Sequence, residues 1–338
     1  MAALVVVLHH VWPMLFPTFT LPWPGAHAVT VFFVLSGFVI AYASLERENG
    51  AVDYVTRRAA RVLSVALPAL VLGLVLGQWR DSYQTPAEFA PNVADSAELW
   101  RTTLVNLAFL GQIWRIDISA PFNYPFWSLD YEVWYFALFG IWRFTRGRAR
   151  TVGLMTTALL CGLKAMLLLP CWLLGVWLYR SGFRIRAPWA GPIWVATVLL
   201  YGLVFWFDVP IRLRSIMFDH YPGAAPWLGA SNTFLGNTII AILVTVNFAA
   251  AGNVTLLQSS LARVATPVRY LAGHTFSIYL FHAPLYVLIG PMLGAPRWAM
   301  LPLLAVAIMA VAQITERQLP LLRRLLVKLI SPVSNLHR

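Results

Sequence analysis

The stretch VTVFFVLSGFVIAYA, residues 29–43, contains no charged side chain and forms the centre of a helix predicted at 27–45. A helix needs about 20 mostly apolar residues to cross a bilayer. Similar runs recur along the chain, whose 338 residues are 59% hydrophobic and only 11% charged. Soluble domains carry about 25% charged residues, so a soluble enzyme is all but excluded. The apolar residues form continuous runs and do not alternate with polar residues, which argues against the strands of an outer-membrane barrel.

The sequence predicts an all-α fold, a polytopic transmembrane helical bundle of about ten spans. A long polar loop is expected over 80–126, and a second loop from about 208 to 230. The stretch 151–180 is also compatible with one long span. Residues 1–315 would form the membrane domain, and 316–338 a basic, amphipathic cytoplasmic tail. The ten predicted helices cover residues 1–16, 27–45, 62–79, 127–144, 151–165, 166–180, 189–207, 232–251, 270–290 and 297–315.

The basic residues indicate how the chain crosses the membrane. With alternating helices and both ends inside, 18 basic residues fall on the inner side and 7 on the outer side. Cytoplasmic loops of membrane proteins collect Arg and Lys. We therefore expect a multi-pass protein of the inner (cytoplasmic) membrane, with both termini and residues 46–61 in the cytoplasm. Topology, and not a nucleic-acid partner, then accounts for the net charge of +12. A single span over 151–180 would weaken this asymmetry.

The two cysteines give no sign of a metal site. Cys161 and Cys171 lie ten residues apart in apolar segments, without the spacing of a zinc site or a disulfide framework. We expect both to be small core residues and expect no metal.

A few ionisable side chains fall within predicted spans, where each costs roughly 2.5–3.5 kcal/mol on insertion scales. Such residues are usually retained for function or for a buried partner. Those found here are His9, His10, Asp130, Glu132, His274 and His282.

His10 and Glu132 are predicted to lie at a similar depth near the outer side, where a His and a carboxylate suit general-base chemistry. Successive helix residues point about 100° apart, so only one of His9 and His10 is expected to face the bundle interior. Two alternatives stay open at this point. The histidines would also suit the outer headgroup region, and Glu132 would suit an ion pair with an outer arginine.

Arg57, Arg58 and Arg61 are spaced to share one helix face. Three guanidinium groups on one face suit a multiply phosphorylated ligand, because each forks onto phosphate oxygens. The alternatives are a topology-setting charge cluster and contact with anionic lipid. Trp127 fits the interfacial aromatic belt, and Ser36-Gly37 fits close helix packing.

Six segments occur in an order that resembles the acyltransferase 3 family of integral membrane O-acyltransferases. Members of that family modify bacterial surface polysaccharides and similar sugars. The likeness runs from the first helix to the tail. The segments are LVVVLHHVW (4–12), FFVLSGFVI (32–40), RRAARVLSVALPAL (57–70), FWSLDYEVWYF (126–136), HTFSIYLFHAPL (274–285) and TERQLPLLRR (315–324).

The resemblance implies acyl-CoA as the donor, acetyl-CoA by default, taken from the cytoplasm, and a saccharide acceptor on the far side of the bilayer. The family's first helix carries an Arg, ten intervening residues and a His, which here is His10. The matching Arg would precede Met1, so we expect the first helix to be the outer part of a longer one. The resemblance further implies catalytic roles for His10 and Glu132, and donor binding by Arg58 and Arg61, which match the family's R-x-x-R motif. Arg57, on the same helix face, is expected to bind the donor with them. The resemblance also implies substrate contacts from Ser36, Trp127, Tyr279 and His282, the last two within an S-x-Y-x-x-H pattern that begins at Ser277.

The expected mechanism follows from the chemistry of a sugar hydroxyl, which needs a base to attack a thioester. A neutral imidazole at His10 suits this task near pH 7, and Glu132 would orient or stabilise it. Direct transfer and a transient acyl-histidine both stay open. The alternative functions are a transporter of a small solute or polysaccharide precursor, and a non-catalytic subunit of a polysaccharide assembly complex.

Overall fold

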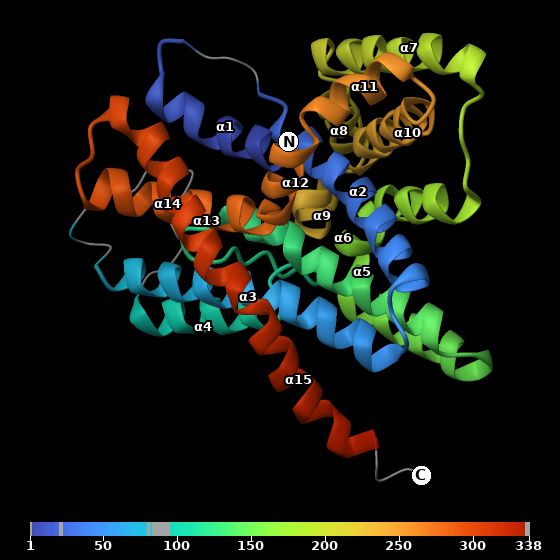
Figure 1. The fold of residues 1–338 in the computed structure, drawn as a ribbon. Coiled ribbons are helices and arrows are strands. Elements are labelled where there is room, and N and C mark those ends of the chain that lie inside the picture. Colours follow the sequence, from blue (N-terminus) through green and yellow to red (C-terminus); the bar gives the residue numbers. More distant parts are fainter. Residues whose placement is uncertain (1, 20–22, 80–81, 83–94, 335–338) are drawn as a thin grey trace.

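A computed structural model describes residues 2–19, 23–79, 82 and 95–334. Within these residues the chain is helical and contains no β-strand, which confirms the predicted all-α class. The helices pack side by side, with α7 at one edge and α15 extending away from the bundle toward the C-terminus (Figure 1).

Short helical turns connect the longer elements at Tyr124–Phe126, Pro222–Ala224 and Gly229–Ser231, and a π-helical turn, Leu288–Met292, follows α13. The α-helices are α1 Ala2–Leu15, α2 Gly25–Glu46, α3 Ala51–Gln78, α4 Ser96–Leu107, α5 Trp127–Phe144, α6 Gly147–Ser181, α7 Ala187–Trp206, α8 Val209–His220, α9 Ala225–Leu228, α10 Phe234–Ala251, α11 Thr255–Arg263, α12 Ala265–Gly273, α13 Thr275–Val287, α14 Arg297–Arg317 and α15 Leu319–Ser334.

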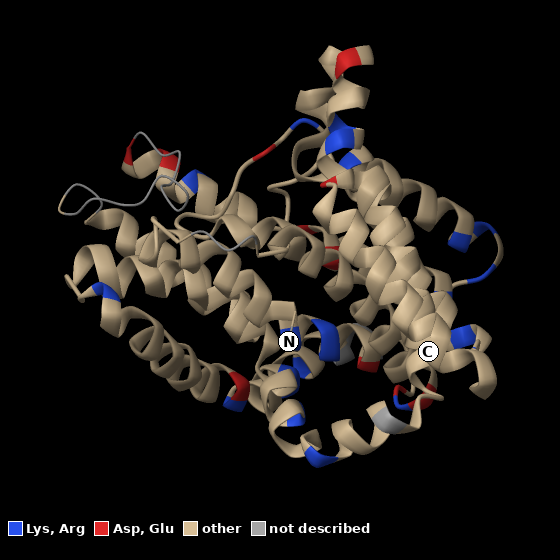
Figure 2. Ribbon diagram, turned by 90° about the horizontal axis from the view of Figure 1, so that it is seen from above, with Lys and Arg blue, Asp and Glu red and all other residues tan. Residues whose placement is uncertain are grey.

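Seven helical segments of the described chain are long and apolar enough to cross a membrane, as expected of a multi-pass protein. Helix α1 is too short for this set and α5 carries too many charges. Helix α6 is one of the seven segments, although it consists of two helical arms that are described below. With α1, α5 and the second arm of α6 included, the segments correspond one to one with the ten predicted helices. Charged residues gather at helix ends and connections, with long uncharged stretches between them (Figure 2). The seven segments are Gly25–Glu46, Ala51–Gln78, Gly147–Ser181, Ala187–Trp206, Pro222–Ala251, Thr275–Met292 and Arg297–Ile330.

Two stretches predicted as loops contain helices. The 80–126 stretch includes α4, whose N-terminus is capped by the Asp95 carboxylate accepting from the Glu98 amide at 2.8 Å. The 208–230 stretch includes α8 and α9. These helices are short and lack a long apolar run, so a search for membrane spans overlooks them. Arg80, Asp81 and Glu88 of the first loop lie outside the described residues.

The third helix also differs from its prediction, because it begins at Ala51 rather than at 62. The arginines predicted to precede the helix therefore lie within its first turns. The connection 252–269, expected as an inner loop, forms α11 and most of α12. The predicted tail forms the separate helix α15, which packs against α3.

Helix α6 folds back on itself at Gly162, where φ is +79° and ψ −177°. Leu154 of the first arm and Val176 of the second line the same hollow. Arg180, near the end of the second arm, lies 4.5 Å from the ring of Trp142 at the end of α5, next to where the first arm begins. Both ends of α6 are therefore at one end of the bundle. The predicted division into two helices is confirmed, with the break at Gly162.

Helices α2 and α6 pack very closely. A Cβ on Gly37 would lie 2.0 Å from the Trp172 carbonyl oxygen, and a Cβ on Gly175 would lie 1.9 Å from that of Val34. The two backbones touch because neither position carries a side chain, as in many membrane helix pairs. This confirms the packing role predicted for Gly37.

Substituting Gly175 by alanine should therefore destabilise the protein, because the new methyl group meets backbone that cannot move aside. Overpacking of this kind costs about 1–3 kcal/mol or more. The control is Gly202→Ala in α7, where a Cβ meets nothing within 4 Å and alanine favours the helix. Thermal unfolding of the detergent-solubilised protein compares the two. Equal stability of both variants would contradict the close α2–α6 contact.

Candidate functional site

A polar cavity of about 550 Å³ opens at the end of the bundle where α1 ends and α2 begins. We call it the histidine cavity. Its walls come from α1, α2, α8, α13 and the segments that precede α5 and α10. The polar and aromatic side chains that line it are His9, His10, Asp117, Tyr124, Trp127, Arg214, Phe218, Asn232, Thr233 and Tyr279.

His10, which lines the histidine cavity, stacks on His282, which is not among the described lining residues; the ring centroids are 5.5 Å apart and the planes at 27°. His282 is fully buried, and its Nδ1 lies 2.7 Å from the Tyr279 carbonyl oxygen. A carbonyl only accepts, so Nδ1 carries the proton and Nε2 keeps its lone pair. Among the described residues that Nε2 has no hydrogen-bond partner.

His9 also lines the cavity, so both adjacent histidines reach it and the expectation that only one faces inward is not met. Their surroundings differ. The Nδ1 of His9 lies 2.7 Å from the Trp23 carbonyl oxygen, which ties its ring to the segment between α1 and α2. His10 instead packs against His282 of α13.

Tyr279 and Trp127 both line the cavity, as their predicted contacts with substrate require. The Tyr279 hydroxyl donates to the Pro125 carbonyl oxygen at 2.9 Å and lies 2.8 Å from the Ser128 hydroxyl. These bonds join α13 to the start of α5. Ser277, from the same sequence pattern, is turned away from the cavity and lies 3.2 Å from the Thr315 hydroxyl.

Glu132 and Ser36 are absent from the described lining of the cavity and meet behind its wall. The Ser36 hydroxyl donates to Glu132 Oε1 and accepts from Trp172 Nε1 at 3.2 Å. Glu132 is 2% exposed. The structure thus brings two predicted site residues together in an unexpected pair, at the junction of α2, α5 and α6.

The arginine cluster, Arg57, Arg58 and Arg61, lies at the opposite end of the bundle, and each member pairs with a carboxylate. Arg57 contacts Asp53 at 2.8 Å, and Arg58 pairs with Glu48. Burial raises the pKa of Glu48 above its ordinary value, an effect that Arg58 opposes.

The third member of the cluster connects three elements. Arg61 contacts Glu316 at 2.7 Å and donates to the Gly273 carbonyl oxygen at 2.9 Å, which joins α3 to α14 and to the end of α12. Arg323 of α15 contacts Asp53 at 2.6 Å. An incoming phosphate would have to displace these carboxylates, so the ion pairs give the cluster a structural role as well.

Helix α13 connects the arginine cluster with the histidine cavity. The Arg61 guanidinium lies 5.2 Å from the Phe276 ring at the start of α13, and His282 follows six residues later. At 1.5 Å per residue, these positions are roughly 9 Å apart along the helix axis. Phe32 packs against both Phe276 and Tyr279 along this path, with ring centroids 5.8 and 6.1 Å apart.

The structure adds site residues that the sequence did not reveal. Asp117 lines the histidine cavity and accepts from Gln112 at 2.7 Å. Arg214 also reaches the cavity from a stretch expected to be a loop, and Asn232 reaches it from the first position of the helix predicted at 232–251. None of these belongs to a recognisable motif, and only the folding of the connecting segments brings them beside His10.

Asp130, an ionisable residue with no assigned role, points elsewhere. It is 1% exposed, and a Cβ on Gly111 would lie 2.7 Å from its Oδ2. His274 likewise lies away from the cavity, with its ring 4.8 Å from that of Tyr270. Neither is among the described residues that line the histidine cavity.

Comparison with known proteins points to one enzyme class. A family model described as an acyltransferase domain matches residues 1–317. The acyltransferase MdmB of Streptomyces mycarofaciens is 29% identical over 121 residues, which is 35% of this chain and 28% of that relative. The chain thus matches less than a third of the relative's length. No solved structure matches.

Arg58→Ala should destabilise the fold strongly, because it leaves the Glu48 carboxylate, 1% exposed, without its cation. Breaking a buried pair from one side costs about 3–5 kcal/mol. Adding Glu48→Gln should recover part of that loss. The control is Arg101→Ala, whose partner Glu98 is 33% exposed and whose loss should cost under about 1 kcal/mol. If thermal unfolding shows the same small loss for both single variants, the Arg58–Glu48 pair is not structural.

Proposed function

Because the chain belongs to the acyltransferase family whose model covers residues 1–317, we propose that it is a membrane O-acyltransferase. It moves an acyl group, acetyl in the simplest case, from acyl-CoA to a hydroxyl of a saccharide. The observation that carries the proposal is the His10–His282 pair at the wall of a polar cavity, joined by α13 to the arginine cluster.

In this proposal the acceptor hydroxyl lies in the histidine cavity. His10 takes the hydroxyl proton as the oxygen attacks the thioester carbonyl carbon. The tetrahedral intermediate collapses, the carbon–sulfur bond breaks, and the CoA thiolate leaves and accepts the proton from the His10 imidazolium. His282 fixes the orientation of the His10 ring through their stacking. Asp117, Tyr124 and Asn232 supply polar groups suited to further hydroxyls of a sugar.

Glu132 acts in the proposal through Ser36. Their hydrogen bond holds α2 against α5, and α2 forms part of the cavity wall. A carboxylate at this depth also favours the positive charge that His10 acquires during the reaction.

We place the donor nucleotide at the arginine cluster on the cytoplasmic side, where the basic residues of the sequence accumulate. The acyl-pantetheine arm then enters the bundle along α13. Its reach suffices, because Phe276 and His282 are only roughly 9 Å apart along the helix. The acceptor meets the acyl group from the opposite side of the membrane.

His10→Ala should lower acyl transfer by about 10²–10⁴-fold, the usual contribution of a general base. Acetyl-CoA binding and thermal stability should stay unchanged, since a base acts mainly in the transition state. His9→Ala should be much milder, because the His9 ring is tied to the Trp23 carbonyl. Glu132→Gln should fall between them. The assay follows radiolabelled acetyl groups from acetyl-CoA onto saccharide in proteoliposomes.

Near-parent transfer by His10→Ala would remove His10 as the base, and a dead His9→Ala would transfer that role to its neighbour. Movement of a labelled saccharide across the liposome membrane without any acylated product would instead support a transporter.

At the donor site, two substitutions should act in opposite directions. Arg61→Ala should weaken acetyl-CoA binding about 10- to 100-fold, because a hydrogen bond to a charged group contributes about 1.5–3 kcal/mol. Glu316→Gln should strengthen binding, because Glu316 competes with phosphate for the Arg61 guanidinium. Calorimetry in nanodiscs measures both affinities. If neither variant changes affinity, or if both weaken it equally, the cluster has only a structural role.

A further inference from the structure

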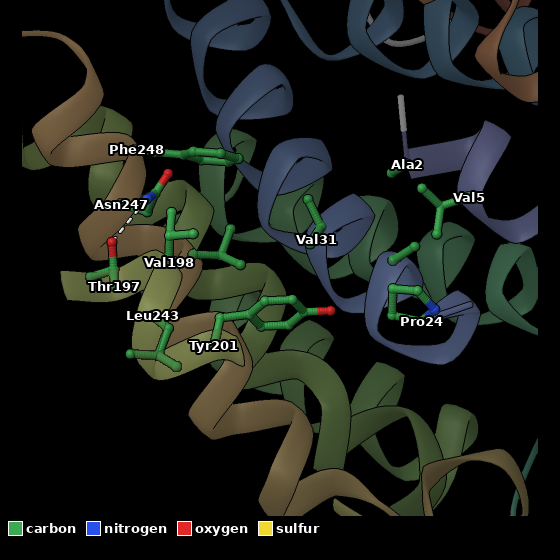
Figure 3. A pocket seen from close by; sticks show the side chains of 12 residues that line it. Ala2, Val5, Pro24, Val31, Thr197, Val198, Tyr201, Leu243, Asn247 and Phe248 are labelled. Atoms are coloured by element: carbon green, nitrogen blue, oxygen red, sulfur yellow. Dashed lines mark hydrogen bonds between the residues drawn. The ribbon is translucent and has the colours of Figure 1, made fainter. Parts of the chain in front are cut away.

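An apolar groove of about 320 Å³ runs between α1 and α2 on one side and α7 and α10 on the other (Figure 3). Its walls include Val5, Val31, Val198, Leu243 and Phe248. Only Ala190 and Thr197 are buried in α7, and its other residues are half-buried or exposed, so much of that apolar helix is open to the bilayer. The groove therefore lies where a hydrocarbon chain of the membrane can enter it.

The apolar groove is the outermost of three adjoining hollows. It shares Pro24 with a middle cavity of about 400 Å³, which in turn shares His9, Gly25 and Ala26 with the histidine cavity. Helix α1 spans the series, from Ala2 at the groove to His10 at the histidine cavity. The series is thus apolar toward one end of α1 and polar toward the other, which matches the profile of an amphipathic molecule.

The middle cavity contains polar atoms that lack a partner among the described residues. Asn237 is 6% exposed, and its amide nitrogen donates to Thr233 while its Oδ1 accepts no bond. Trp23 Nε1 is likewise a buried donor without an acceptor among the described residues. Both residues line the middle cavity. Buried polar groups are almost always hydrogen-bonded, so one acceptor and one donor beside this cavity are consistent with a ligand that carries hydroxyl groups.

A polar pair marks the boundary between groove and middle cavity. The Tyr201 hydroxyl, which points toward α2 in Figure 3, lies 3.3 Å from His27 Nδ1. Tyr201 lines the apolar groove and His27 lines the middle cavity. The bond between Asn247 and Thr197, at 2.8 Å, satisfies the amide on the far side of the groove. Polar character therefore increases from the groove toward His10.

We propose that the acceptor is a lipid-linked hydroxylated compound, whose hydrocarbon chain lies in the apolar groove and whose head group occupies the middle and histidine cavities. This inference rests on the proposed function and specifies the acceptor class. The hydrocarbon chain in the groove belongs to the acceptor and not to the donor. The donor is placed at the arginine cluster, which lies at the opposite end of the bundle. The head group of such a lipid is held at the membrane edge, next to His10.

The test uses the protein in nanodiscs and a dodecyl glucoside that carries a diazirine on its chain. After irradiation, mass spectrometry should find adducts on the groove residues of α2, α7 and α10. Unlabelled dodecyl glucoside should compete, whereas methyl glucoside at equal concentration should not. Val198→Trp fills the groove and should reduce labelling by about tenfold or more, because the chain loses its buried contact surface.

The matched control is Val195→Trp on the same helix. Val195 and Val198 are 48% and 46% exposed, but only Val198 is among the described residues that line the groove. The Val195→Trp variant should be labelled by the diazirine probe to the same extent as the parent protein. Equal labelling of the two variants would overturn the proposal. So would equal competition by phosphatidylcholine, because the groove would then bind ordinary bilayer lipid.

Acyl transfer separates this inference from the proposed function. The parent should acylate dodecyl glucoside in preference to methyl glucoside, and Val198→Trp should remove the preference while it still acylates methyl glucoside. Equal rates on both glucosides, unchanged in Val198→Trp, would overturn the inference and leave the acyltransferase standing. Chain-dependent labelling with no acylation of either glucoside would support the groove and count against the function.

Discussion

The direct contact between the backbones of α2 and α6 determines where the rest of the site lies. Gly37 and Gly175 let the two helices touch, and this contact places Ser36 between Glu132 of α5 and Trp172 of α6. Three helices thus meet around one hydroxyl group. A bilayer offers no water to a buried carboxylate, so Glu132 depends on this hydrogen bond. The position of α2 then sets one wall of the histidine cavity.

The apolar segments could be predicted well because each has to satisfy its backbone internally across the bilayer. The helix at 127–144 was predicted with the same bounds that the structure shows. The break within 151–180 was predicted between residues 165 and 166, and the structure places it at Gly162. Helices α4 and α8 were missed because their amphipathic sequences resemble polar loops. A membrane-span pattern carries no information about such connecting helices.

For the site, the sequence indicated which residues are unusual but not which ones meet. Glu132 and Ser36 were both predicted as site residues, yet depth alone could not show that they pair with each other. The same limit applies to the carboxylate partners of the arginine cluster, since Glu316 lies 255 residues from Arg61 in the sequence. Asp117 carries no motif, because its place in the cavity depends on how a connecting segment folds.

Arg61 has a consequence for communication between the two faces of the membrane. One guanidinium holds Glu316 of α14 and the carbonyl of Gly273, directly before α13. A ligand that draws Arg61 away from these partners changes the restraint on α13, whose second half carries His282. Thermodynamic linkage makes such an effect reciprocal, so occupancy at the histidine end alters affinity at the arginine end by the same factor. In the proposed function, binding of the donor and binding of the acceptor would then be coupled through α13.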